Sequence, residues 1–171
     1  DKSKHFVQIW QQGRHPMPGH PAQYMMPMEA VLSLLYFNLD MFDTSGVEHP
    51  EPTWTFKDWE EAGAKLTKKD GDKTTHFGLY GRNSNTFLDA FINSNDGLVL
   101  SPDFKSCKLD QRPSIVMIDR CVQWIRQGIG PTSAQAMDIS GGADLFASRR
   151  LGMDITGSWN IEAFLKSNNL N

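Results

Sequence analysis

One short stretch near the end of the chain combines residues that suit the binding of a small polar ligand. A strand-like run over 152–155 leads to Gly157, and Ser158 and Trp159 then precede an amphipathic helix over 160–165. Ligands of α/β proteins sit beyond the carboxyl ends of the strands. Glycine lets the backbone approach a ligand closely, and an indole offers a flat face for stacking. The alternative is a core tryptophan beside a turn glycine, and these residues alone leave both open.

Glu29 is the only formal charge in an otherwise apolar run over 25–38. A lone carboxylate is costly to bury without a partner, so we expect Glu29 at the end of a strand or in a functional site. His15 and His20 could bind a metal, but no acidic or thiol residue lies near them in sequence, which favours ordinary loop histidines. We expect no metal and no cofactor.

Common catalytic and nucleotide-binding motifs are absent from the sequence. It contains no GxSxG, P-loop, GxGxxG or HExxH motif, and its Asp and His residues are scattered. Cys107 and Cys121 lack the spacing of a zinc site, and the sequence does not say whether they pair. These features favour binding over catalysis.

Composition indicates one ordinary globular domain. The 171 residues are 39% hydrophobic and 22% charged, and they are enough to bury a core. The net charge of −3 gives no polybasic surface, so we expect no nucleic-acid partner. No apolar run reaches the roughly 20 residues of a membrane span. No signal peptide opens the sequence, so we expect a cytosolic, processed or excised chain.

The chain alternates between strand and helix patterns, which predicts an α/β fold. Residues 1–24 form an irregular, proline-rich segment, and the apolar run over 25–38 predicts a buried strand. Further strands are expected over 76–81 and 152–157, and a small hairpin over 98–109. Thr55 and Asp58 form a capping box for a helix that we expect to end at 70–72. Other helices are expected over 86–92, 113–127 and 142–147, and at the end of the chain.

Four stretches, in order along the chain, resemble the sequence pattern of one family. The first is the run after Pro27, ending in Leu35-Tyr36-Phe37-Asn38-Leu39-Asp40-Met41-Phe42. The second is Pro52-Thr53-Trp54 with Trp59-Glu60, and the third is Gly128-Ile129-Gly130-Pro131 after Trp124. The fourth is Gly152-Met153 with Thr156-Gly157-Ser158-Trp159. Together they resemble the extracellular solute-binding proteins of ABC importers, the family that includes maltose-binding proteins.

The resemblance implies a single lobe of a two-lobe, type II periplasmic-binding-protein-like fold. Residues 25–38 would be the crossing strand between lobes, and residues 39–171 an incomplete second lobe. The sequence would lack the first lobe, so we expect a domain piece or fragment that presents half a site. The implied partners are a small solute, most simply a carbohydrate, the membrane subunits of an importer and the missing first lobe. The implied location is periplasmic, or lipid-anchored as a lipoprotein.

The resemblance also implies a set of ligand-binding residues. Trp159 would stack on a sugar ring, and Gly157 would let backbone groups reach the solute. Glu29, at the crossing, would accept hydrogen bonds from sugar hydroxyls, although a hinge-supporting salt bridge is its alternative. The other candidates, in or just after the loop that follows the strand over 76–81, are Asn83, Asn85, Phe87 and Asp89. Asn38 is expected to be structural, with its side chain tying the turn before Leu39.

Two other functions remain open at the level of sequence. A carbohydrate-active enzyme would need two carboxylates facing a cleft, and Glu29 with Asp89 or Asp154 is the only pair to nominate. A structural or adhesion module would instead use the aromatic surface for protein contacts.

Overall fold

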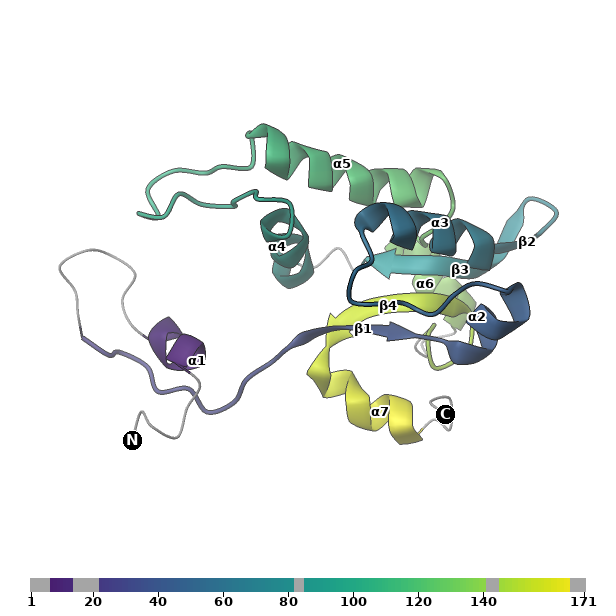
Figure 1. The fold of residues 1–171 in the computed structure, drawn as a ribbon, viewed down its shortest axis with the longest axis horizontal. Helices are drawn as coiled ribbons and strands as arrows, with labels where there is room; N and C mark the ends of the chain where they lie inside the picture. Colours follow the sequence, from purple (N-terminus) through teal and green to yellow (C-terminus); the bar gives the residue numbers. More distant parts are fainter. Residues whose placement is uncertain (1–6, 14–21, 82–84, 141–144, 167–171) are drawn as a thin grey trace.

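The computed structural model describes residues 7–13, 22–81, 85–140 and 145–166. The elements run in this order: α1 (Val7–Gln12), β1 (Ser33–Phe37), α2 (Leu39–Ser45), α3 (Phe56–Leu66), β2 (Lys68–Asp70), β3 (Lys73–Gly81), α4 (Asn85–Asn93), α5 (Arg112–Arg126), α6 (Ser133–Ser140), β4 (Leu151–Gly157), η2 (Ser158–Asn160) and α7 (Ile161–Lys166) (Figure 1). Helices and strands alternate, which confirms the expected α/β class.

The four strands form one mixed sheet in the order β1-β4-β3-β2. Strand β4 runs parallel to β3 and antiparallel to β1, and β2 runs antiparallel to β3. Gly81 pairs with Ile155, and Ser33 pairs with Gly157. The carboxyl ends of β3 and β4 and the start of β1 therefore share one edge of the sheet.

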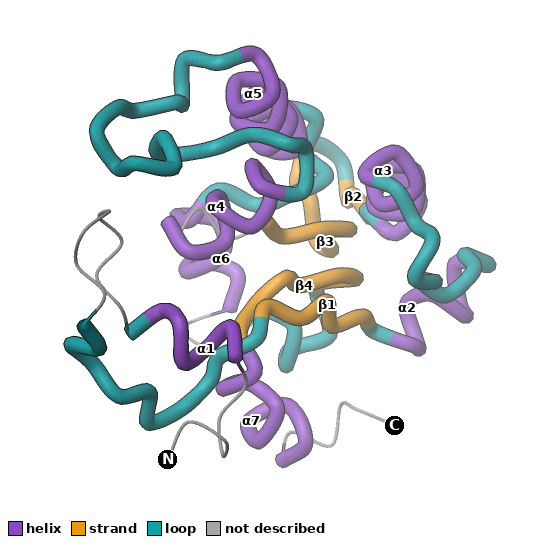
Figure 2. The backbone as a smooth tube through the Cα atoms, turned by 60° about the vertical axis from the view of Figure 1, so that its left-hand side comes forward, coloured by secondary structure: helices purple, strands orange, loops and turns teal. Residues whose placement is uncertain are grey.

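Strand β4 lies at the centre of the molecule. It has a neighbouring strand on each side, and all of its residues are buried. Helices α3, α4 and α5 lie on one side of the sheet and α7 lies on the other (Figures 1 and 2). In one core cluster, residues of helices α2, α3, α4 and α5 pack against residues of strands β3 and β4. A second cluster joins Tyr36, Phe146 and Phe164 beneath the sheet.

Helix α3 starts where the sequence predicts. Asp58 N–H donates to Thr55 Oγ1 over 3.4 Å, and Thr55 N–H donates to Asp58 Oδ2 over 2.6 Å, so the capping box is confirmed. The helix packs directly on β3 through two glycines: a Cβ on Gly78 would overlap the backbone of Gly63. This contact brings the helix and strand backbones together without side chains between them.

Asn38 is structural, as predicted. Its Oδ1 accepts the Met41 N–H over 3.1 Å and so caps α2. Its own N–H donates to the Gly152 carbonyl over 2.9 Å, which links the end of β1 to β4. Gly46 then ends α2 at φ 62°, a left-handed conformation that favours glycine.

Several expected elements differ from the structure. The buried strand over 25–38 is wrong for its first part, because only Ser33–Phe37 pairs and most of residues 24–32 are exposed. The hairpin over 98–109 is reduced to a single bridge between Leu100 and Cys107. Helix α3 ends before 70–72, where Gly71 instead turns β2 into β3. Of the helix expected over 142–147, residues 142–144 lie outside the described ranges, and residues 145–147 form turns after α6.

The start of the segment before β1, residues 23–25, is hydrogen-bonded to α1 and the residue after it. Tyr24 and Met25 donate their N–H groups to the Gly13 carbonyl over 2.9 and 3.1 Å. Gln23 Nε2 donates to the carbonyls of Trp10 and Met25. Residues 22–32 then run to β1 as a long connection that stands apart from the layers of the sheet (Figure 1). None of the helices within the described ranges combines the length and the apolar character that a membrane span requires.

Candidate ligand-binding edge

Three segments that are distant in sequence meet at the edge where β3 and β4 end. The segment entering β1 arrives at Leu32 and Ser33, and β4 leaves at Gly157. Strand β3 leaves beside them at Gly81, and α4 begins soon afterwards at Asn85. Ligands of α/β sheets bind beyond such strand ends. The arrangement makes this edge the candidate site.

The indole of Trp159 lies face-on against Gly157. A Cβ at Gly157 would overlap three consecutive atoms of the six-membered ring, Cε3, Cζ3 and Cη2, at nearly equal distances. Gly157 itself is buried, whereas Trp159 is 56% exposed. Trp159 is therefore not a core tryptophan: one face of its ring covers the backbone, and more than half of the residue is open to solvent.

Hydrogen bonds hold the turn that carries this ring. Ser158 N–H donates to the Leu32 carbonyl over 2.9 Å, and Leu32 N–H donates to Ser158 Oγ over 3.3 Å. Tyr36 Oη donates to the Gly157 carbonyl over 3.2 Å. Asn160 Nδ2 donates to Thr156 Oγ1 over 2.9 Å. The turn is thereby tied to β1, to the segment before β1 and to β4.

The contributions of Leu32 and Tyr36 to this edge were not predicted from the sequence. Their partners lie more than a hundred positions away, so no local pattern marks them. Burial raises the pKa of Tyr36, and the nearby Asp154 raises it further. A tyrosine phenol is protonated at neutral pH, and here it donates to the Gly157 carbonyl.

The other predicted site residues come from the two flanking segments. Glu29 is exposed in the connection before β1, and Asp89 is exposed on α4. Asn85 and Phe87 lie in the first turn of α4, which follows the end of β3. Asn83 lies outside the described residues. Their roles in binding stay predictions.

A family model described as bacterial extracellular solute-binding protein matches residues 2–171. The chain belongs to this family. The match covers almost the whole sequence, and it agrees with the resemblance found in the four ordered stretches. The family binds solutes for transport and is not a family of enzymes. No match to a curated protein sequence was found.

Solved structures of solute-binding proteins share the fold of this family member. A substrate-binding protein from Listeria monocytogenes, in complex with cycloalternan, superposes with a TM-score of 0.82 at 24% identity, over 98% of this chain and 41% of that chain. The acarbose-binding GacH receptor of Streptomyces glaucescens gives 0.73 at 20% identity, over 99% and 42%. A maltotriose-bound maltodextrin-binding domain from Bdellovibrio bacteriovorus gives 0.69 at 18% identity, over 93% and 41%. The chain thus spans less than half the length of these proteins.

One of the carboxylates nominated for an enzyme, Asp154, is not accessible to a ligand. Asp154 is fully buried within β4, and it pairs across strands with Tyr36 and Tyr80. Glu29 and Asp89 are exposed on separate segments. Asp154 therefore cannot reach a solute in the arrangement described.

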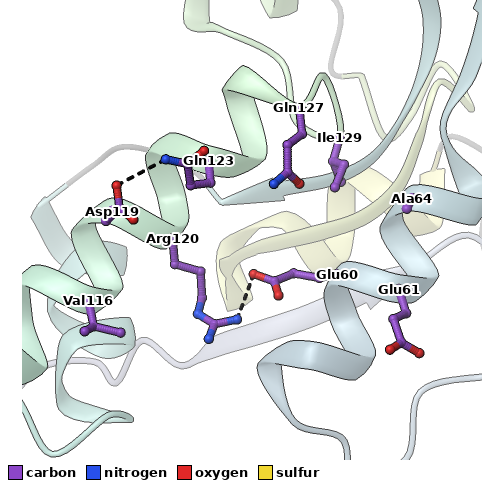
Figure 3. A pocket seen from close by; sticks show the side chains of 9 residues that line it. All are labelled: Glu60, Glu61, Ala64, Val116, Asp119, Arg120, Gln123, Gln127 and Ile129. Atoms are coloured by element: carbon purple, nitrogen blue, oxygen red, sulfur yellow. Dashed lines mark hydrogen bonds and ion pairs between the residues drawn. The ribbon is translucent and has the colours of Figure 1, made fainter.

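A hollow of about 460 Å³ lies between α3 and α5 (Figure 3). Glu60, a partly buried carboxylate in its lining, has partners on α5. Glu60 Oε1 accepts the Trp124 Nε1–H over 2.8 Å and pairs with Arg120 Nη1 over 2.7 Å. Its outer polar groups, Glu61 and Asp119, add negative charge. These contacts join α3 to α5, so we assign the hollow to helix packing.

Within the ranges that the structure describes, no three His, Cys, Asp or Glu residues gather as metal ligands would. His15 and His20 lie outside those ranges. Cys107 and Cys121 are both free, the first exposed and the second buried.

Proposed function

We propose that this chain forms one wall of the sugar site in the solute-binding component of an ABC importer. The observation that carries the proposal is the half-exposed indole of Trp159, held at the shared end of β3, β4 and the segment entering β1. Aromatic faces suit the apolar C–H faces of sugar rings. Membership of the solute-binding family and the sugar-bound structural neighbours support the same assignment.

The predicted polar site residues would supply specificity. Glu29, Asn83, Asn85 and Asp89 offer acceptors and donors for sugar hydroxyls, and such oriented groups complement stacking in ligand sites. Phe87 would add a second aromatic side chain to the site. No chemical step is involved, because the mechanism is capture and release rather than catalysis.

The opposite wall would come from a first lobe. The sugar-bound neighbours are more than twice as long as this chain, which supports a two-lobe protein that closes on its solute. A solute that contacts both lobes binds the closed form better and so shifts the population toward it. The closed form would then deliver the solute to the importer's membrane subunits, from the periplasm or from a lipid anchor on the outer face of the membrane.

The proposal is tested by a thermal-shift screen of the full protein that carries this chain, followed by calorimetric titration. The panel consists of maltose, maltotriose, mannobiose and tagatose, which are bound in neighbouring structures, with amino acids and peptides for comparison. We expect at least one sugar to stabilise the protein. We also expect Trp159→Ala to weaken binding of that sugar by about tenfold or more, roughly 1.4 kcal/mol.

The control is Phe104→Ala. Phe104 is 53% exposed but lies on the loop between α4 and α5, so its loss should leave sugar affinity unchanged. The same screen on the 171-residue chain alone should give weak or no binding, because one wall is absent. Stabilisation by amino acids or peptides but by no sugar would contradict the carbohydrate assignment. Unchanged sugar affinity in Trp159→Ala would contradict the site.

A further inference from the structure

Gly157 has no need of glycine's conformational freedom. Its backbone angles are φ −80° and ψ 160°, an extended conformation that any residue adopts without strain. By contrast, Gly46, Gly71 and Gly128 have positive φ, where glycine is favoured for backbone reasons. The glycine at position 157 therefore requires a different explanation.

The space that a side chain would take at position 157 is filled by Trp159. The six-membered ring of the indole lies where the Cβ would be, and no other atom comes as close to that position. An alanine would overlap the ring, so either the indole or the backbone would have to move. Because β4 is buried along its length and paired on both sides, the indole is the part that can move.

The surrounding contacts fix the backbone on which the ring rests. Ser158 and Leu32 exchange two hydrogen bonds, and Tyr36 Oη binds the Gly157 carbonyl from the buried side. A ring held flat on such a backbone exposes only its opposite face. A sugar ring can then stack only on the exposed face of the indole, parallel to the plane of the ring.

We propose that Gly157 is a positioning residue, whose missing side chain lets the Trp159 indole rest flat against β4 in the orientation that binds the sugar. This inference rests on the proposed sugar site and changes the role first expected for Gly157. Gly157 acts on the ligand through the indole, and its own backbone does not contact the sugar. A ring held in place before binding loses less rotamer freedom when the ligand arrives, which favours affinity.

The first test needs no ligand. The 171-residue chain is labelled with 5-fluorotryptophan, and the Trp159 resonance is assigned by its loss in Trp159→Leu. We expect Gly157→Ala to shift the Trp159 fluorine resonance. The control, Gly71→Asn in the β2–β3 turn, should leave it in place, because asparagine tolerates positive φ and a side chain at Gly71 meets no atom. An unchanged Trp159 resonance in Gly157→Ala would overturn the proposal.

The second test is a double-mutant cycle for sugar affinity in the full protein, with maltotriose or whichever panel sugar binds most tightly. We expect Gly157→Ala to weaken binding about as much as Trp159→Ala does, by about tenfold. The double variant Gly157→Ala/Trp159→Ala should bind the sugar as tightly as Trp159→Ala alone. The reason is that an alanine at position 157 weakens sugar binding only by displacing the indole. Losses that multiply in the double variant would show that Gly157 contacts the sugar itself, and would overturn the proposal.

The two tests separate failure of this inference from failure of the proposed function. If the unmodified full protein binds no sugar, the proposed function fails, and the fluorine shift still decides whether Gly157 holds the indole. If the unmodified protein binds sugar and Gly157→Ala binds it with the same affinity, the sugar site stands and the positioning role of Gly157 is excluded.

Discussion

A single residue near the start of β3, His76, makes the stability of the protein depend on pH. His76 lies partly buried on β3, opposite Lys68 on β2. Burial lowers the pKa of His76, and the positive charges of Lys68 and Arg150 lower it further. The folded protein thus prefers the neutral imidazole, while the unfolded chain has the ordinary histidine pKa of about 6.5.

This difference predicts a loss of stability in acid. The unfolded state binds a proton at higher pH than the folded state, so the stabilisation is complete above the unfolded pKa and is lost as pH falls through the folded pKa. We expect the Tm to fall between pH 7 and pH 5 and to fall less in His76→Gln. Calorimetry at both pH values measures this, and equal decreases in the two proteins would contradict it.

Among the elements, α3 and β3 depend on a close backbone contact. A Cβ at Gly78 would collide with the carbonyl and Cα of Gly63. Both residues are buried, so neither backbone can withdraw toward solvent. The contact places β3, and hence its end at Gly81, relative to the helical layer.

We therefore expect Gly78→Ala to lower the free energy of unfolding by about 3 kcal/mol, the upper part of the range for overpacked cores. Gly71→Ala is the matched control, because its side chain would meet no atom and only its φ of 58° is unfavourable. That control should cost about 1 kcal/mol. Urea unfolding compares the two, and an equal cost would refute the packing argument.

Across the described parts of the molecule, the connection before β1 stands out for its exposed methionines. Met28 is 97% exposed, and Met25 and Met26 are each 66% exposed. Tyr24, Val31 and Leu32 of the same segment are exposed as well, and large exposed apolar patches are typical of interaction sites. In the proposed two-lobe protein, the first lobe would cover it.

Oxidation with dilute hydrogen peroxide tests this exposure. In the 171-residue chain we expect Met25, Met26 and Met28 to form sulfoxides well before Met117 and Met153, which are fully buried. In the full protein the three exposed methionines should react more slowly than in the chain alone, while the two buried ones remain unchanged. Peptide mass spectrometry measures each rate, and equal rates for the exposed group in both proteins would argue against a covering lobe.

The sequence by itself determined the features that depend on neighbours a few residues apart. The capping box of Thr55 and Asp58 and the cap at Asn38 both form within one helical turn. The strand, glycine and tryptophan order around Gly157 was also visible locally, and the ordered motifs indicated the family.

The tertiary structure decided everything that requires distant segments to meet. Ser158 and Leu32 are hydrogen-bonded although they lie 126 positions apart in the sequence. The exposure of residues 24–32 likewise depends on which other parts of the fold are available to cover them. The sequence left Trp159 between core and site, because an apolar ring suits both. In the folded chain, Trp159 lies against Gly157, at the edge shared by β3, β4 and the entry to β1, and half of it stays exposed. The sequence could not show this, because the burial of a residue depends on how the whole chain packs.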